Sequence, residues 1–252
     1  MKVFAIINQK GGTGKTTVSM NLSARLAELG KKILLIDIDP QGNATSGSGA
    51  DKYLIGGGVY DVLGGRDAAS CLIFSLGGGY WLLGANMNLA GAEIELVGEE
   101  EWQCHLRRAI APLREEFDFI FIDCPPSLGA LTVNALVAAD SVLIPMQCEY
   151  FAMEGLSDLA ETVRKLRAGW NPSLRVAGIV RSMLDGRNLL ARNISDELSR
   201  HFGDKVFTAA IGRNVRVAEA PSYCLPVLKY APQSSGAEGY RRLGDEFLGR
   251  FG

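Results

Sequence analysis

A glycine-rich segment, NQKGGTGKTT at residues 8–17, nearly matches the phosphate-loop pattern G-x-x-x-x-G-K-[ST]. Lys15 would neutralise the β- and γ-phosphates of a nucleotide, and the hydroxyl of Thr16 would ligate Mg²⁺. The pattern fails at Gln9, where its first glycine belongs, and Lys10 adds a second lysine beside it. The segment therefore predicts a nucleotide site with one lysine more than the phosphates of a single chain require.

The residues around this segment decide between a phosphate loop and a merely flexible glycine turn. An apolar run at Val3–Ile7 leads into it, and Val18, Leu22 and Leu26 follow at helical spacing. This order of strand, loop and helix favours a phosphate loop, because backbone N–H groups and the start of a helix then converge on the phosphate oxygens. The predicted nucleotide-binding residues of the loop are Gly11, Gly12, Thr13, Gly14, Lys15, Thr16 and Thr17.

Three aspartates stand at the ends of two other apolar runs. Asp37 and Asp39 follow KKILLI, and their i, i+2 spacing places both carboxylates on the same side of an extended chain. Asp123 ends the run FDFIFID, a pattern typical of an aspartate that holds Mg²⁺ through water. A carboxylate at a strand end can also be a helix cap or a solvated terminus. Three of them in a chain with a phosphate loop favour a magnesium site.

Lys10 leaves two interpretations open. Its side chain either points to solvent or completes a nucleotide site from outside its own chain. A cation supplied by a partner can stabilise the charge that develops in the transition state of phosphoryl transfer. The hypothesis is that Lys10 reaches the nucleotide bound by a second subunit.

Short apolar runs alternate with stretches of helical period along the chain. The strands are predicted at Val3–Ile7, Ile33–Ile36, Tyr80–Leu83, Phe119–Ile122, Val142–Ile144, Val176–Val180 and Lys205–Phe207. The helices are predicted near residues 15–29, 99–115, 129–138, 153–169, 188–202 and 236–250, and the glycine-rich loops at residues 41–65 and 75–91. This rhythm predicts one α/β domain over residues 1–252, with a doubly wound, mostly parallel sheet and helices on both faces. Together with the phosphate loop, it indicates a fold of the P-loop NTPase type.

Composition excludes several classes of protein. The chain has 252 residues, is 47% hydrophobic and carries a net charge of -2, which is ordinary for a globular protein. No apolar stretch approaches the ~18 residues of a spanning helix, so no stable membrane insertion is expected. The five cysteines are scattered without a C-x-x-C pair, so reduced thiols and a cytoplasmic location are expected.

Charge is distributed unevenly along the chain. Residues 1–159 contain 11 Lys and Arg against 19 Asp and Glu, whereas residues 160–252 contain 15 against 9. This asymmetry is compatible with a basic face in the second part, and equally with a solvated surface that has no partner.

Further motifs give a family resemblance that covers essentially the whole chain. K-G-G-x-G-K-T at residues 10–16 is followed by L-x-D-x-D-P-Q-G-N at residues 35–43 and I-D-C-P-P-S at residues 122–127. Q-C-E-Y at residues 147–150 and R-N-V-R at residues 213–216 continue the match. The combination resembles the deviant-Walker-A ATPases of the ParA/Soj type and is far more specific than the loop alone.

The resemblance implies a switch protein that uses ATP and Mg²⁺ to move chromosomes or plasmids. ATP would close a homodimeric sandwich that binds double-stranded DNA without sequence preference, in the cytoplasm and on the nucleoid. A ParB-type centromere-binding protein would then stimulate slow ATP hydrolysis and release the DNA.

Residue roles follow from the same resemblance. Lys10 would contact the phosphates of the partner subunit, and Asp39 matches the carboxylate that positions the attacking water. Gly11 would allow another backbone to approach when the dimer closes. The implied catalytic residues are Lys10, Lys15 and Asp39, and the implied magnesium residues are Thr16, Asp37 and Asp123.

The base and DNA contacts are carried over from the family in part. Ser182 and the turn Gly212-Arg213-Asn214 correspond to positions that flank adenine, although the family commonly has proline where Gly212 stands. The DNA-binding candidates are Arg187, Arg213 and Arg216, since a planar guanidinium can bind two phosphate oxygens. Each arginine can instead cap a helix or pair with a carboxylate.

Three alternatives stay open. A MinD-like membrane-associated positioning ATPase would use residues 241–252 as an amphipathic helix, although Asp245 and Glu246 interrupt its charge pattern. An iron–sulfur assembly ATPase would need converging cysteines, of which only Cys124 stands near the nucleotide loops. A binding module without turnover would lack Asp39.

Overall fold

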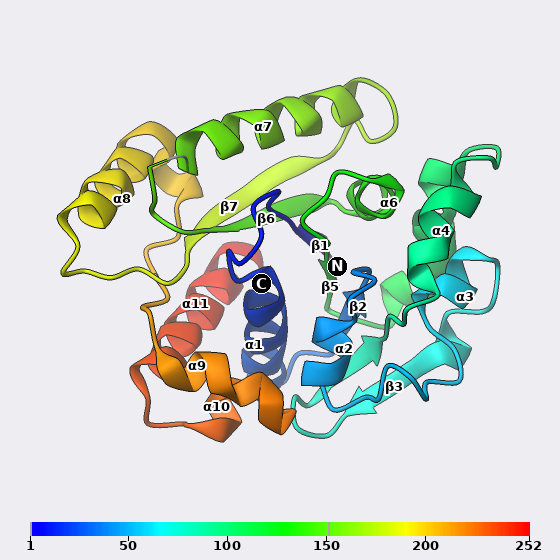
Figure 1. Cartoon of the computed structure of the whole chain (residues 1–252), viewed down its shortest axis with the longest axis horizontal. Helices are drawn as coiled ribbons and strands as arrows, with labels where there is room; N and C mark the ends of the chain where they lie inside the picture. The colour runs from blue at the N-terminus through cyan, green and yellow to red at the C-terminus, as the bar shows by residue number, and fades with distance from the viewer. Residues whose placement is uncertain (1, 151) are drawn as a thin grey trace.

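The structure is a computed structural model that describes residues 2–150 and 152–252. A seven-stranded sheet with the order β3-β4-β2-β5-β1-β6-β7 forms its centre (Figure 1). The strands are β1 (Lys2–Ile6), β2 (Ile33–Asp37), β3 (Leu72–Ser75), β4 (Tyr80–Leu83), β5 (Phe119–Asp123), β6 (Ser141–Met146) and β7 (Arg175–Arg181). All pairs are parallel except β3 with β4. The predicted α/β fold with a mostly parallel sheet is confirmed.

Side chains of the central strands alternate between two buried clusters. In β1, Val3 and Ala5 belong to one cluster, and Phe4 and Ile6 belong to the other. Successive side chains of a strand point to opposite faces of the sheet, so a strand without polar residues supplies two cores at once. The lack of polar alternation in these runs is thereby explained.

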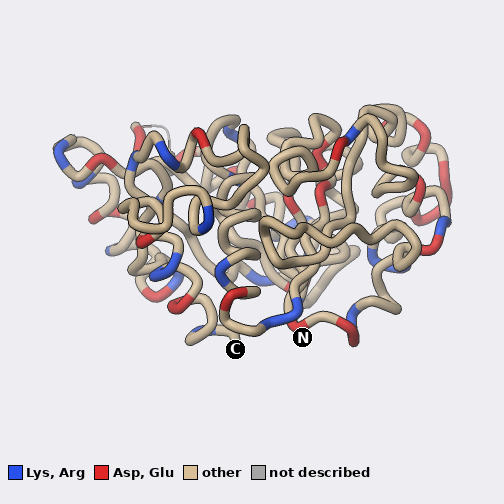
Figure 2. The backbone as a smooth tube through the Cα atoms, turned by 90° about the horizontal axis from the view of Figure 1, so that it is seen from below, with Lys and Arg blue, Asp and Glu red and all other residues tan. Residues whose placement is uncertain are grey.

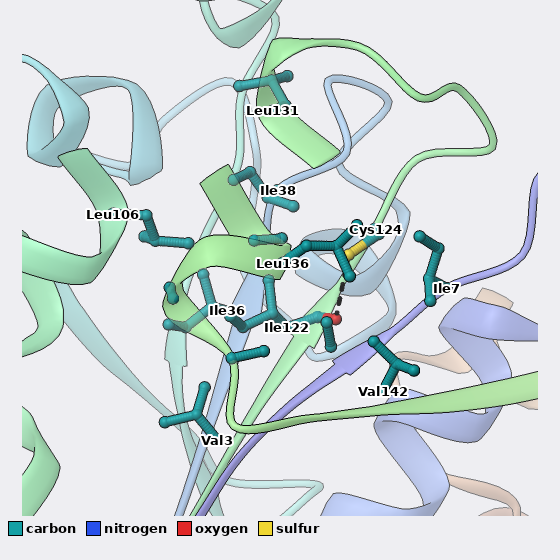
Figure 3. Packing of buried hydrophobic residues seen from close by; sticks show 14 of the residues in the cluster. Val3, Ile7, Ile36, Ile38, Leu106, Ile122, Cys124, Leu131, Leu136 and Val142 are labelled. Atoms are coloured by element: carbon teal, nitrogen blue, oxygen red, sulfur yellow. Dashed lines mark hydrogen bonds between the residues drawn. The ribbon is translucent and has the colours of Figure 1, made fainter. Parts of the chain in front are cut away.

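One face of the sheet carries most of the helices, which Figure 1 shows above and to the right of it. They are α3 (Val59–Leu63), α4 (Leu89–Leu96), α5 (His105–Ile110), α6 (Ala130–Ala138), α7 (Ala152–Ala168) and α8 (Leu189–Phe202). Figure 3 shows Leu131 and Leu136 of α6 and Leu106 of α5 over the strand residues Ile36 and Ile122. This cluster closes the core on that side.

The opposite face is covered by the first and last long helices. The helices on this side are α1 (Lys15–Glu28), α2 (Asn43–Gly47), α9 (Val215–Glu219), α10 (Val227–Tyr230) and α11 (Ser235–Phe251). The Phe247 ring of α11 lies 4.9 Å from Phe4 and 5.4 Å from Phe119 between ring centroids. The apolar side of α11 therefore belongs to the core. In the described part of the chain, no helix combines the length and apolar character needed to cross a bilayer.

Two predicted elements were wrong. The predicted helix at residues 99–115 begins only after Glu101, which has a positive φ of 51°, and is three short pieces. The α-helical piece ends before Pro112, which cannot continue an α-helix. The strand predicted at Lys205–Phe207 does not form; only an isolated bridge joins Val206 to β7. The short 3-10 helices are η1 (Ala69–Cys71), η2 (Trp102–Cys104), η3 (Pro112–Glu115), η4 (Gly203–Lys205) and η5 (Ala220–Tyr223).

The residues after the missing strand show why it does not extend. Glu246 of α11 accepts hydrogen bonds from the backbone N–H groups of Thr208 and Ala209, both at 2.8 Å. These N–H groups are among those that a longer strand would have to direct at a neighbouring strand. The predicted glycine-rich loops also contain more structure than expected, namely α2, α3 and the start of α4.

Charged residues are intermixed over much of the surface. Seen from below the view of Figure 1, Lys and Arg lie among Asp and Glu, and acidic residues gather at the right-hand end (Figure 2). In this view the positions of Lys and Arg do not gather on one side of the described chain, although the second part of the sequence carries excess positive charge.

Candidate nucleotide site

The phosphate loop is shaped by two glycines in the left-handed region. Gly12 has φ 72° and Gly14 has φ 87°, a conformation that L side chains rarely adopt. Gly14 directly precedes α1, so the N–H groups of the first helical turn face the loop. The backbone conformation of the loop therefore favours glycine at Gly12 and Gly14, two of the three glycines in G-G-T-G-K-T.

Side chains from β6 and β7 hold the loop in place. The Ser182 hydroxyl, directly after β7, donates to the carbonyl of Thr13 at 2.6 Å. The Gln147 amide, directly after β6, donates to the carbonyl of Gly12 at 2.7 Å and contacts Met183 Sδ at 3.2 Å. The carboxyl ends of β6 and β7 thus fix the loop that follows β1.

The two lysines of the loop point to different places. Lys15 is buried, and its Nζ donates to the carbonyl of Lys10 at 3.4 Å, inside the curve of the loop. Burial lowers the pKa of Lys15, and the charges of Asp123 and Asp39 oppose that shift. The Lys10 side chain is 55% exposed and forms an ion pair with Glu149, outside the loop. Lys15 thus lies where the predicted phosphate lysine of this chain should lie, and the Lys10 side chain is directed elsewhere.

Two of the three aspartates face each other across neighbouring strands. Asp37 of β2 and Asp123 of β5 are register partners, and both are fully buried. Asp37 accepts from the N–H and the hydroxyl of Thr45, both at 2.7 Å, and from the N–H of Asp39 at 3.2 Å. Burial raises the pKa of Asp37 to about 6 despite these bonds.

Asp123 has an oxygen that the protein leaves unsatisfied. Its Oδ1 accepts from the Ser19 hydroxyl at 2.8 Å, but its buried Oδ2 has no hydrogen-bond partner among the described residues. Burial raises the pKa of Asp123 to about 8, the charge of Asp37 adds to this shift, and the Thr16 hydroxyl opposes it. A cation near these carboxylates would offset both the unsatisfied oxygen of Asp123 and the burial of negative charge beside Asp37.

The chemistry of these residues suits Mg²⁺ held through water. Within residues 2–150 and 152–252, no group of three or more His, Cys, Asp or Glu side chains is placed to ligate a metal directly. Mg²⁺ usually keeps several of its waters and binds to few protein ligands. Thr16 would be the direct ligand, while Asp37 and Asp123 would accept from metal-bound water.

The buried carboxylate predicts a pH dependence of stability in the nucleotide-free protein. The pKa of Asp123 rises from 3.8 to about 8 on folding, so the folded state binds this proton more tightly. The free energy of unfolding should therefore fall as pH rises across that window. In Asp123→Asn this fall should be smaller, and its melting temperature should exceed that of the wild type by ~3 °C or more at about pH 9, but not at about pH 5. Equal melting profiles in EDTA would contradict this expectation.

A cavity of about 390 Å³ lies beside the loop. Its wall includes Gly14, Thr17, Ser182, Gly212, Arg213 and Asn214, all of them predicted nucleotide contacts. Apolar side chains that the sequence did not indicate, among them Met183 and Val215, complete the wall. The structure thus brings the predicted base-binding residues together next to the phosphate loop, and their role stays a prediction.

The three predicted DNA-binding arginines have different surroundings. Arg187 is 93% exposed and bonds Asp185 through Nε at 3.0 Å and Nη2 at 3.1 Å. Arg216 pairs with Glu219 at 2.9 Å, whereas Arg213 lines the cavity. Arg187 and Arg216 therefore have the carboxylate partners that the alternative interpretation foresaw, and both would have to exchange them for phosphates.

Several contacts of the site were missed in the sequence. Ser19 lies four residues after Lys15 on α1, and this spacing was the available signal that its hydroxyl faces the same side. Gln147 stood in the family motif Q-C-E-Y, but its contact with the loop was not predicted. Met183 and Thr45 carried no comparable signal, because their roles depend on how β7 and α2 meet the loop. Cys124 is buried and burial raises its pKa, as expected of a packed thiol rather than a ligand (Figure 3).

Comparison with known proteins decides the family. A family model described as an AAA domain matches residues 1–176. The sporulation initiation inhibitor protein Soj of Bacillus subtilis (strain 168) is 48% identical over 246 residues, which cover 97% of each chain. The chain belongs to the ParA/Soj family of partitioning ATPases. A second relative of this partitioning ATPase is the chromosome-partitioning ATPase Soj of Thermus thermophilus. The two are 49% identical over 247 residues, which cover 98% of this chain and 95% of that protein.

Solved structures agree on the fold of this partitioning ATPase. Cobyrinic acid a,c-diamide synthase from Mycobacterium smegmatis matches with a TM-score of 0.86 and 34% identity, covering 98% of this chain and 94% of that one. That structure contains a bound ATP analogue and magnesium. The predicted family and fold class are therefore confirmed.

Proposed function

We propose that this partitioning ATPase is an ATP-driven switch for chromosome or plasmid segregation. Two chains with bound ATP and Mg²⁺ close into a sandwich, and the dimer binds double-stranded DNA without sequence preference. A ParB-type centromere-binding protein stimulates hydrolysis and releases the DNA. The protein works in the cytoplasm and lies on the nucleoid while ATP is bound.

The direction of Lys10 is the observation that carries the proposal. The Lys10 ammonium lies outside the loop, where it is half exposed and forms an ion pair with Glu149. The Lys15 ammonium already lies inside the loop. A lysine outside the loop can meet a phosphate that arrives with another chain. Gly11 beside it is exposed, and a Cβ there would have no atom within 4 Å. No contact within the chain requires a glycine at this position, and the open space beside it leaves room for a backbone that approaches from outside.

The mechanism assigns one task to each residue of the site. N–H groups of the loop bind the phosphates and Lys15 neutralises their charge. The Thr16 hydroxyl would hold magnesium directly, and Asp37 and Asp123 would hold it through its water. Magnesium, when bound, would neutralise charge that develops on the phosphate oxygens. Asp39 orients the attacking water, and its Oδ1 is itself fixed by the N–H of Gln41 at 2.9 Å.

The partner's Lys10 would then supply the remaining positive charge. Hydrolysis would be slow without it, because charge on the transferred phosphoryl oxygens would lack one of its counter-charges. This arrangement makes turnover depend on dimer closure.

The base would occupy the cavity beside Ser182 and the turn at residues 212–214. Apolar walls at Met183 and Val215 suit the faces of a purine, and polar groups at the rim suit its edge. The M. smegmatis structure with a bound ATP analogue and magnesium supports ATP and Mg²⁺ as the ligands of this fold.

A membrane-associated function has less support. Its amphipathic segment would be the end of α11, yet Leu243 and Phe247 are fully buried in the core. Turning them toward a bilayer would empty their places in the core, and the cavities left behind would destabilise the fold.

The test is binding of an unrelated linear duplex DNA to Asp39→Ala at one moderate salt concentration. The variant should retain ATP because the carboxylate that positions water is gone, so binding with Mg-ATP should exceed binding with Mg-ADP by at least ~10-fold. Binding should also fall steeply as salt increases. Substituting Arg187, Arg213 or Arg216 should then reduce the salt slope by ~1 for each phosphate that the arginine had neutralised. A dimer in ATP that binds no DNA would remove DNA as the platform.

A further inference from the structure

Thr45 contacts Asp37 more closely than any residue of the predicted site. It lies in α2, shortly after Asp39, and is fully buried. Its N–H and its hydroxyl both donate to Asp37 Oδ2 at 2.7 Å. The same hydroxyl accepts from the backbone N–H of Ala85, after β4, at 2.8 Å. One hydroxyl therefore joins the end of β2, the helix α2 and the end of β4.

The direction of these bonds is fixed by chemistry. The Ala85 N–H can only donate, so the single hydroxyl proton of Thr45 is available for Asp37. Two donors then occupy Oδ2 of Asp37, while Oδ1 receives only the long bond of 3.2 Å from Asp39 N–H. Oδ1 is the oxygen with capacity left for a further donor, such as a metal-bound water.

We propose that Thr45 is a positioning residue of the magnesium site, which occupies one oxygen of Asp37 and leaves the other for the metal's water shell. This inference rests on the proposed use of Mg-ATP and extends it to a residue outside the predicted set. Outer partners of this kind orient a ligand and are worth ~10–100-fold in metal affinity.

The surroundings of Thr45 make the role specific to its hydroxyl. Its methyl group faces Gly84, where an added Cβ would lie 3.1 Å from Thr45 Cγ2. A hydrogen bond that does not involve Thr45 also holds the end of α2, since Ser48 Oγ lies 2.8 Å from the hydroxyl of buried Tyr80. Thr45→Val keeps the shape and the backbone bond to Asp37, and it removes only the two bonds of the hydroxyl.

The experiment measures binding of a fluorescent ADP to the full chain, with a Mg²⁺ titration and with EDTA. Thr45→Val should need ~10-fold more Mg²⁺ for half of the Mg²⁺-dependent tightening, with unchanged affinity in EDTA. Thr45→Ser should restore the wild-type Mg²⁺ dependence. Thr132→Val is the matched control, because Thr132 is also fully buried and its hydroxyl donates to the carbonyl of Ser127 at 2.6 Å. It should leave the Mg²⁺ dependence unchanged.

Three results would overturn the assignment. These are an unchanged Mg²⁺ dependence in Thr45→Val, an equal loss of affinity with and without Mg²⁺, and a raised Mg²⁺ requirement in Thr45→Ser. The last of these can be measured even if Thr45→Val does not fold. DNA is not part of this measurement, so a protein that binds Mg-ADP as expected but never binds DNA would refute the proposed segregation switch and leave the role of Thr45 intact.

Discussion

Lys10→Ala should lower ATP turnover by ~10³-fold while nucleotide binding by the single chain is retained. The expected effect is large because a cation that touches the transferred phosphoryl group stabilises charge present only in the transition state. Nucleotide binding should survive because Lys15, inside the loop, is untouched. The measurement is single-turnover hydrolysis, together with binding of a fluorescent nucleotide.

Glu149→Gln separates this role from the ion pair within one chain. Lys10 and Glu149 form a half-exposed pair, and such pairs contribute only ~0–1 kcal/mol. If Lys10 served only this pair, both variants would behave alike. We expect the glutamate variant to keep its turnover, since it leaves the lysine free to act elsewhere.

Mixing two inactive variants shows which chain Lys10 serves. In a mixed dimer of Lys10→Ala and Asp39→Ala, the first chain has its own Asp39 and receives Lys10 from its partner. One complete site is thereby formed if Lys10 acts across the interface. Recovery of turnover on mixing is the expected result, and absence of recovery in a dimer that demonstrably forms would assign Lys10 to its own chain.

Much of the fold could be predicted because its strands are buried on both faces. Runs such as ILLID in β2 and FIFID in β5 have no polar alternation, and they indicated their strand positions within a residue. The first residue of the strand predicted at residues 205–207 belongs to the 3-10 helix η4 instead. The chain does not continue as a strand beyond it, because Glu246, far along the chain, binds the N–H groups of residues 208 and 209, and local sequence does not report such a contact.

The site shows the same division between local and distant causes. The loop glycines, Lys15 and the strand-end aspartates were predictable, because each role follows from its own position on a strand, turn or helix. The contacts of Gln147 and Thr45 depend on which elements meet in space. Thr45 reaches Ala85 across 40 positions of sequence, and no periodicity reports such a bond.

Gly11→Val should abolish ATP-dependent dimerisation and spare nucleotide binding. Within one chain a side chain at Gly11 has room, because a Cβ would have no atom within 4 Å, and its φ is not in the left-handed region. The loop should therefore keep its shape. A branched side chain on this exposed turn would instead collide with any backbone that closes over it, so the loss should appear only on dimer closure.

Gly12→Val provides the contrast, because Gly12, unlike Gly11, is constrained by its own backbone conformation. Gly12 has φ 72°, so a valine there strains the loop itself whatever space surrounds it, and nucleotide binding should weaken already in the single chain. Sedimentation with a non-hydrolysable ATP analogue and Mg²⁺, alongside nucleotide titration, distinguishes the two variants. If Gly11→Val forms dimers as readily as the wild type, Gly11 does not lie at a closing interface, and the case for Lys10 acting across that interface loses its structural support.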